Sequence, residues 1–366
     1  MSLWSDKRCS WIALSRIKGL GSVTVKNLLK GFGDPVDIFR ASESDLLKID
    51  GIRKDVAANI AGRKYDIDPA CELEKLEKHG VRLVTFHDSE YPDSLREIHD
   101  PPVLLYVKGN KIPDRKYISM VGSRNATHYG IKAAEELAQG LSRRGLGIVS
   151  GMAMGIDAAS HWGCLTGRGF TVAVLGTGLD IVYPGENRKL YEKIIEKGAV
   201  VSEYLMGTPP SPSNFPKRNR IISGLSRGIV VVEATRKSGS LITASLALEQ
   251  GREVFAVPGS IDSFKSRGCH FLIKHGAMLV ENTDDIMEGL GLNYPGMNKS
   301  DTFFKKVLPP MNEEEKKVYD LLGEYPVHID EISRKGSLEP GELSGILTRM
   351  ELMGVVKQLA GKMFVK

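Results

Sequence analysis

Nine short apolar runs between residues 81 and 280 constrain the fold of this chain more than any other feature. Each is rich in β-branched or aromatic residues, and most are separated by a segment with helical periodicity. The runs cover residues 81–86, 103–107, 117–121, 147–149, 171–175, 199–202, 228–233, 253–257 and 277–280. Short, nearly all-apolar strands that alternate with helices indicate a parallel sheet covered on both faces. We therefore predict a doubly wound α/β domain over residues 81–292.

The segments on either side of this domain follow other patterns. Within residues 1–80, segments 17–29 and 47–60 both match a helix-hairpin-helix spacing, although Arg53 takes the place of the second glycine in the second copy. Such a turn leaves backbone N–H groups free for a phosphate. Glycines that form tight corners in a small helical bundle explain the same residues. The DNA-contacting and the purely structural interpretation both stay open for this all-α domain.

The carboxyl-terminal part predicts a linker and a winged helix. Residues 293–312 lose periodicity and contain three prolines, as linkers do. Residues 313–366 hold three helical patterns followed by strand, turn and strand. A winged helix often reads DNA with its third helix, but residues 340–354 offer only Arg349 against Glu342 and Glu351. We expect a protein contact there at least as much as a DNA contact.

Composition limits the class of protein and its partners. With 42% hydrophobic and 26% charged residues the chain is typical of soluble globular proteins. The four cysteines form no CxxC pair or metal-spaced cluster, so we expect no disulfide framework, no metal and a reducing cytoplasm. Without an apolar run of membrane length, no membrane span is expected. The net charge of +5 favours an anionic partner only weakly.

The clearest candidate for a binding site is the basic segment of residues 212–227. Residues 212–227 contain no acid and four cations: Lys217, Arg218, Arg220 and Arg227. Ser213 or Asn214 is placed to cap a helix whose first turns carry these cations. A cation at a helix start costs about 0.3–1 kcal/mol unless an anion is present. Phe215 adds an aromatic face, and stacking contributes about 1–3 kcal/mol per base in single-stranded nucleic acid. We predict a bound polynucleotide; a solvated basic loop with a core phenylalanine is the alternative.

Two further loops follow predicted strands. Gly122 and Ser123 can present backbone N–H groups at a helix start beside Arg124, which suits a phosphate, although a tight turn with a solvated arginine is an equal alternative. Asp157 and His161 are four residues apart and share a helical face. They form either an acid/base pair or, as we expect, a hydrogen bond that orients the helix. No nucleophile, P-loop or GxGxxG motif is found, which argues against an enzyme.

Together these segments resemble the DNA processing protein A (DprA, also called Smf) family. The matching blocks are VGSR at 121–124, SGMAMGIDAASH at 150–161, GTGLDIVYPGEN at 176–187, SEYLMGTPPSPSNFPKRNRIISGLS at 202–226, VVVEATRKSGSLITASLALEQGR at 230–252 and VFAVPG at 254–259. The resemblance implies an extended Rossmann-like domain that binds single-stranded DNA without a cofactor. It also implies a homodimer that protects incoming DNA and hands the strand to the RecA recombinase during natural transformation.

The resemblance also implies which residues bind the DNA. The corresponding positions are Gly122, Ser123, Arg124, Phe215, Lys217, Arg218, Asn219 and Arg220, with Arg236, Lys237 and Lys265 as weaker candidates. A rival class is the Rossmann-like phosphoribohydrolases of nucleoside monophosphates. Those enzymes place a glutamate just past a PGGxGT loop, whereas here the loop is residues 238–243 and the next acid is Glu249. A protein adaptor with an incidental basic loop is a second rival, which salt-dependent DNA binding would exclude.

Overall fold

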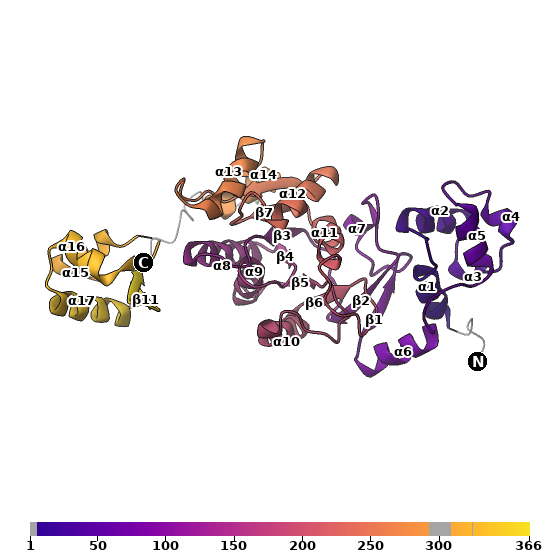
Figure 1. The fold of residues 1–366 in the computed structure, drawn as a ribbon, viewed down its shortest axis with the longest axis horizontal. Coiled ribbons are helices and arrows are strands. Elements are labelled where there is room, and N and C mark those ends of the chain that lie inside the picture. Colours follow the sequence, from indigo (N-terminus) through magenta and orange to yellow (C-terminus); the bar gives the residue numbers. More distant parts are fainter. Residues whose placement is uncertain (1–5, 293–308, 324) are drawn as a thin grey trace. The chain divides into compact units, whose positions relative to one another are not determined.

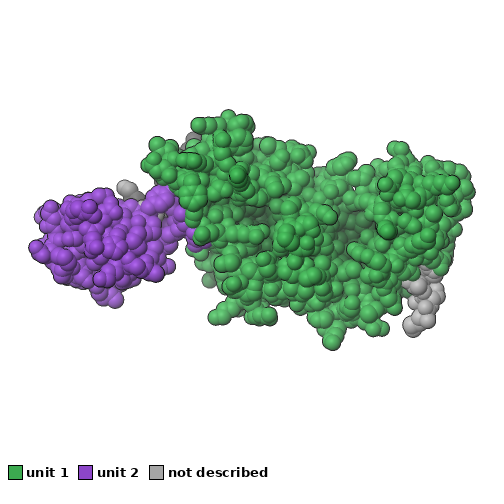
Figure 2. All heavy atoms as spheres, viewed as in Figure 1, with its two compact units in different colours: residues 1–125, 134–290 green, residues 126–133, 291–366 purple. Residues whose placement is uncertain are grey.

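The computed structural model of the chain describes residues 6–292, 309–323 and 325–366. These form two compact units, one of residues 1–125 and 134–290 and the other of residues 126–133 and 291–366 (Figure 2). No helix of the described residues is long and apolar enough to cross a membrane.

The first unit is built on one nine-stranded sheet with the order β1-β2-β6-β5-β4-β3-β7-β8-β9 (Figure 1). The strands are β1 (Arg82–Thr85), β2 (Leu104–Gly109), β3 (Tyr117–Val121), β4 (Gly147–Ser150), β5 (Thr171–Val174), β6 (Ala199–Ser202), β7 (Gly228–Val231), β8 (Glu253–Ala256) and β9 (Met278–Leu279). Each predicted strand is therefore present. The doubly wound, Rossmann-like prediction for this domain is confirmed.

The prediction of a parallel sheet was wrong for one strand, β2. Strands β3 to β9 all run parallel to one another, but β2 runs antiparallel to both of its neighbours, β1 and β6. The connection from β1 to β2 contains only the four-residue helix α7 (Asp93–Arg96), too little for a parallel crossover. The sequence of β2 has the pattern of a parallel strand because Leu104 to Val107 are apolar and buried on both faces of the sheet.

Helices cover both faces of the sheet. On one face α7, α11 (Asn214–Gly224), α12 (Gly239–Glu249) and α13 (Arg267–Lys274) share a core with inward residues such as Val149, Val174 and Val231. Helices on the other face include α9 (Ile156–Thr166) and α10 (Arg188–Lys197) (Figure 1). Helix α8 (His128–Arg143) meets α14 (Thr283–Gly289) at Gly140, where a Cβ would lie 2.9 Å from Thr283. Short 3-10 turns η1 (Gly185–Asn187) and η2 (Phe264–Ser266) precede α10 and α13.

The amino-terminal helices pack onto the sheet rather than standing apart. They are α1 (Lys7–Ser15), α2 (Ser22–Phe32), α3 (Pro35–Ile38), α4 (Glu43–Leu46), α5 (Lys54–Ala61) and α6 (Pro69–Lys78). Their core is continuous with the side chains of Leu104 and Tyr106 on β2. The carboxylate of Glu72 on α6 accepts a hydrogen bond from the backbone N–H of Met206, at 2.8 Å. Apolar burial and a buried hydrogen bond thus join the two parts of this unit.

The carboxyl-terminal domain is a winged helix, as predicted. It contains α15 (Glu313–Leu321), α16 (Ile329–Gly336) and α17 (Pro340–Leu352), with strands β11 (Lys357–Leu359) and β12 (Met363–Val365). A short third strand, β10 (Val327–His328), pairs with β12 and was not predicted. Arg349, the one cation of α17, pairs with Glu315 at 3.2 Å. Residues 293–308 of the predicted linker lie outside the described residues.

Candidate nucleic-acid interface

The strand order changes direction at β3, which lies between β4 and β7. Ligands of doubly wound sheets bind outside the carboxyl ends of the strands at such a switch point. Here the loops after β3, β4 and β7 meet. The Ser123 N–H donates to the Glu233 carbonyl at 2.7 Å, and the Ile156 N–H donates to the Ser123 carbonyl at 3.2 Å. The polar candidates in these loops are therefore positioned by backbone contacts.

Two glycines allow these loops to approach so closely. A Cβ on Gly122 would lie 2.6 Å from Ile156 Cγ1. A Cβ on Gly155, where φ is +76°, would lie 2.2 Å from the Ser123 carbonyl oxygen. Only glycine combines that conformation with that contact.

The expected phosphate cradle of Gly122 and Ser123 needs correction. The Ser123 N–H is already used by Glu233, and α8 begins only at His128 rather than directly after the glycine. The Ser123 N–H is therefore not free for a phosphate. Arg124, which is exposed, remains the candidate anion-binding group of this loop.

An aromatic–arginine cluster of Arg124, Tyr183, Phe215 and Arg218 forms beside this loop. The guanidinium carbons of Arg124 and Arg218 lie 5.5 Å and 5.9 Å from the centre of the Phe215 ring. The Tyr183 ring lies 5.6 Å from the same ring, at an interplanar angle of 31°. The Phe215 ring also packs against Gly176, where a Cβ would approach Phe215 Cδ1 to 3.0 Å. The structure thus brings Arg124, Phe215 and Arg218 together as the sequence predicted.

Arg218 is the buried member of the cluster. Its guanidinium donates to the Gly151 carbonyl at 3.0 Å and to the Val174 carbonyl, at the ends of β4 and β5. Burial lowers the pKa of Arg218 to about 10, while the Asp157 carboxylate opposes this shift. The group therefore remains charged at neutral pH. It places a fixed positive charge under Phe215 without facing solvent.

Asp157 and His161 do not form the expected pair, either as acid and base or as a hydrogen bond. The Asp157 carboxylate accepts N–H groups of Gly151 and Ala153 at 3.2 and 3.3 Å, whereas the Nδ1 of His161 contacts Thr171 Oγ1 at 2.6 Å. Burial lowers the pKa of His161 to about 3, so its ring is neutral at physiological pH. Both side chains have structural roles here.

The start of α11 also differs from the expectation. Ser213 occupies the N-cap position, but its side chain makes no capping hydrogen bond, and neither it nor Asn214 serves as the predicted cap. The cations on this helix were expected to need an external anion. For Arg218 the protein's own carbonyls and Asp157 supply the partner.

Arg220 is not a member of the aromatic–arginine cluster, which corrects its predicted place. Its guanidinium forms ion pairs with Glu203 at 2.7 Å and with Asp100 at 2.9 Å, and its side chain is only 13% exposed. Two residues after Arg218, it projects about 200° further around the helix. With Lys217 it lines a separate cavity of about 460 Å³, which also contains Arg16, Tyr106 and Leu205.

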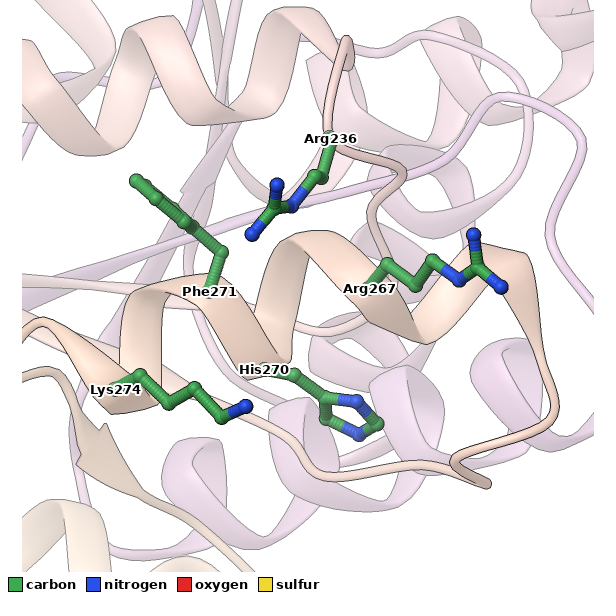
Figure 3. A pocket seen from close by; sticks show the side chains of 5 residues that line it. All are labelled: Arg236, Arg267, His270, Phe271 and Lys274. Atoms are coloured by element: carbon green, nitrogen blue, oxygen red, sulfur yellow. The ribbon is translucent and has the colours of Figure 1, made fainter.

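The remaining candidates lie at different distances from the cluster. Asn219 accepts a hydrogen bond from Arg218 Nε at 3.2 Å, so it adjoins the cluster. Lys237 is exposed in the loop between β7 and α12. The Nζ of Lys265 donates to the Asn125 carbonyl at 2.6 Å, beside Arg124. Arg236 turns toward α13, with its guanidinium carbon 5.4 Å from the Phe271 ring (Figure 3).

Sequence reasoning missed Tyr183 and the acids that bind Arg220. Tyr183 is 41% exposed and lies in the segment 176–187. The sequence signal that could have identified it is an aromatic residue shortly after a glycine-rich strand end. Asp100 stands 120 residues before Arg220, and no spacing pattern indicates that contact. Among the described residues no group of three His, Cys, Asp or Glu side chains could hold a metal ion.

Family models match three parts of the chain. The model of DNA recombination-mediator protein A matches residues 82–291, the DprA winged helix domain matches residues 305–362, and a SAM-like helix-hairpin-helix tandem matches residues 12–61.

Individual proteins are similar over most of their length. Protein Smf of Synechocystis is 34% identical, covering 98% of both chains. DNA processing protein DprA of Streptococcus pneumoniae is 45% identical, covering 66% of this chain and 85% of its own.

Two solved structures share the fold. The structure of the Streptococcus pneumoniae DprA has a TM-score of 0.67 at 41% identity, covering 76% of this chain and 97% of its own. A structure of DNA processing protein A from Helicobacter pylori, which concerns its single-stranded DNA binding mode, has a TM-score of 0.52 at 28% identity. It covers 58% of this chain and 97% of its own.

Proposed function

Because this chain belongs to the DNA recombination-mediator protein A (DprA/Smf) family, we propose that it binds single-stranded DNA at the aromatic–arginine cluster. The observation that carries the proposal is the half-buried Phe215 ring with two guanidinium groups within 6 Å of its centre. An aromatic face next to fixed cations binds a strand by stacking and by charge, with no readout of base edges.

Each member of the cluster has its own task. Arg124 is exposed and has no ion pair among the described residues, so it is available to a phosphate. Phe215 stacks a base, and the exposed Tyr183 ring beside it extends the stacking surface. Arg218 is buried, and it holds the Phe215 ring in place and raises the local positive potential. Lys217, which lines the cavity beside Arg220, and Lys237, in the loop after β7, are exposed cations that suit further phosphates.

The resemblance to the family also implies a cellular role. We propose that the chain protects an incoming strand and passes it to the RecA recombinase in natural transformation, a role that a sequence-tolerant site supports. We propose that the chain acts as a homodimer in the cytoplasm, without cofactor and without catalysis. The rival phosphoribohydrolase function lacks support at the site, because the first turn of α12, which follows Ser238, contains no acidic residue.

The test is a fluorescence-anisotropy titration with single-stranded oligonucleotides across a salt series. If about three phosphates are neutralised, the affinity falls roughly 20-fold between 50 and 200 mM salt, with a slope near −0.7 per contact. Arg124→Ala lowers the affinity and makes the slope shallower by about 0.7. Duplex DNA of the same length binds more weakly, since its bases are not free to stack.

Arg168→Ala is the matched control for Arg124→Ala. Arg168 is also exposed, but it precedes β5 and so lies at the opposite edge of the sheet. Its replacement leaves affinity and slope unchanged. A salt-independent affinity, or equal losses in both variants, would contradict the proposed site.

A further inference from the structure

The first hairpin of the amino-terminal helices lies at the cavity that Lys217 and Arg220 of α11 also line. This hairpin cavity has a volume of about 460 Å³. Leu20 and Ser22 line it from the turn between α1 and α2, and Tyr106 lines it from β2. From the sequence, a DNA-contacting and a structural interpretation of this hairpin were both open. Its place beside the basic helix α11 favours the DNA-contacting one.

The start of α2 presents backbone N–H groups that the protein does not use. Gly21 occupies the N-cap position and has no side chain to cap the helix. The first N–H of the helix to donate is that of Val25, to the Gly21 carbonyl at 3.0 Å. The N–H groups of residues 22–24 have no acceptor among the described residues, and the first turn contains no acid. An anion at this helix start would meet free donors and the positive end of the helix dipole.

The hydroxyl of Tyr106 points independently to a ligand in the same cavity. The Tyr106 side chain is 1% exposed, and its hydroxyl has no hydrogen-bond partner among the described residues. A buried hydroxyl without a partner is unfavourable. Burial raises the pKa of Tyr106, so the hydroxyl keeps its proton and is available as a donor. An acceptor oxygen in the cavity would satisfy this donor.

The charges around the hairpin cavity leave one cation without a partner. The two acids that line the cavity, Asp100 and Glu203, both pair with Arg220. Arg16, which also lines it, pairs with a carboxylate outside the cavity. Lys217 is exposed and has neither an ion pair nor a side-chain hydrogen bond among the described residues. A negatively charged ligand therefore finds a free ammonium group and the start of α2 at one cavity.

The hairpin cavity adjoins the aromatic–arginine cluster through the first turn of α11. Lys217 lies two residues after Phe215 in that turn. The hydroxyl of Tyr204, which also lines the cavity, donates to the Asn214 carbonyl at 3.2 Å, one residue before Phe215. A strand that stacks a base on Phe215 can therefore place a following phosphate at Lys217 and continue into the cavity.

We propose that the hairpin cavity binds a phosphate of the single-stranded DNA that leaves the aromatic–arginine cluster. The free N–H groups at the start of α2, the Tyr106 hydroxyl and the Lys217 ammonium group donate to this phosphate. The inference rests on the proposed function, and it gives the amino-terminal helices a direct part in DNA binding.

Tyr106→Phe tests the buried donor in an anisotropy titration with oligo(dT) of about 20 nucleotides. The hydroxyl has no partner in the free protein, so its removal leaves the stability measured by urea unfolding unchanged. The variant loses a hydrogen bond to a charged phosphate, and we expect its affinity to fall roughly 10-fold.

Tyr117→Phe is the matched control for Tyr106→Phe. Tyr117 is also buried, but its hydroxyl donates to the Pro113 carbonyl at 3.0 Å, and it begins β3 at the edge of the sheet opposite the cluster. This variant loses stability and keeps its affinity for the oligonucleotide.

Ser22→Asp tests the helix start. A carboxylate at the first position of α2 is favourable for the helix itself but repels a phosphate. We expect the fold to be kept, the affinity to fall roughly 5-fold at about 0.1 M salt and the salt slope to become shallower by about 0.7, the value of one contact. Ser44→Asp is the control, because it adds the same charge at an exposed position of α4 that does not line the cavity. It leaves affinity and slope unchanged.

Unchanged affinity in either Tyr106→Phe or Ser22→Asp would overturn the inference. A loss of stability in Tyr106→Phe as large as that in Tyr117→Phe would also overturn it, because the hydroxyl would then serve the fold. The same holds for an equal loss of affinity in Ser44→Asp, which would be a general effect of charge. If Arg124→Ala weakens binding while any of these results holds, only the hairpin cavity fails. If the wild-type chain does not bind the oligonucleotide, the proposed function fails as well.

Discussion

At the scale of single residues, the two arginines of α11 differ in what surrounds them. Arg218 is held by carbonyl oxygens beneath Phe215, whereas Arg220 is held by two carboxylates on another side of the helix. The sequence places both among the candidate DNA contacts. From its two ion pairs we expect Arg220 to contribute chiefly to stability.

Arg220→Ala should therefore destabilise the fold. The change leaves Glu203 and Asp100 without their partner, and the loss of one member of a largely buried pair costs about 3 kcal/mol. Urea unfolding at neutral pH measures the change. Arg220→Lys keeps the charge but not the bidentate hydrogen-bonding geometry, so it should lose less stability. A stable Arg220→Ala variant with weakened DNA binding would instead restore Arg220 to the binding site.

His161 should make the protein sensitive to acid. Its pKa is about 3 in the fold because burial disfavours the charged ring, against an ordinary value of 6.5. The unfolded chain binds the proton first, so stability is full above pH 6.5 and falls by up to about 1.4 kcal/mol per pH unit below it. His161→Gln keeps a polar partner for Thr171 without titrating. Unfolding free energies at several pH values should give a shallower acid slope for this variant, and identical slopes would contradict the assignment.

At the scale of elements, the contact between the loop after β3 and the start of α9 determines where Arg124 lies. The Ile156 N–H binds the Ser123 carbonyl, and Gly155 leaves room for that contact. This pairing of two loops depends on backbone geometry. It is therefore visible in the sequence only as glycines at strand ends.

Gly155→Ala should disrupt this contact. Its Cβ would meet the Ser123 oxygen at 2.2 Å, and φ is +76°, so strain and overlap together cost roughly 3–5 kcal/mol. Gly145→Ala is the control, because its φ is +83° but nothing lies within 4 Å of the new Cβ. It should lose only about 1–2 kcal/mol. Thermal unfolding should show the larger loss of stability for Gly155→Ala, and DNA titration should show lost affinity for that variant alone.

At the scale of the whole molecule, the sequence predicted the elements better than their arrangement. All nine strands and the winged helix follow from local apolar patterns. The antiparallel direction of β2 does not, because a strand buried on both faces has the same pattern in either direction. Likewise, the basic segment indicated an anion site, but only the fold shows which cations already have internal acids. Arg124, Phe215 and Arg218 were predictable from their residue types, while Tyr183 and the hairpin cavity required the three-dimensional arrangement.

The amino-terminal helices share their apolar core with β2 and cover Tyr106, which is 1% exposed. A shortened protein that starts at β1 would expose this apolar surface of β2 to water, and we expect it to precipitate on expression. Polar side chains at Leu104 and Tyr106 would be needed to keep such a shortened protein in solution, so the length of this chain and the polarity of its second strand depend on each other.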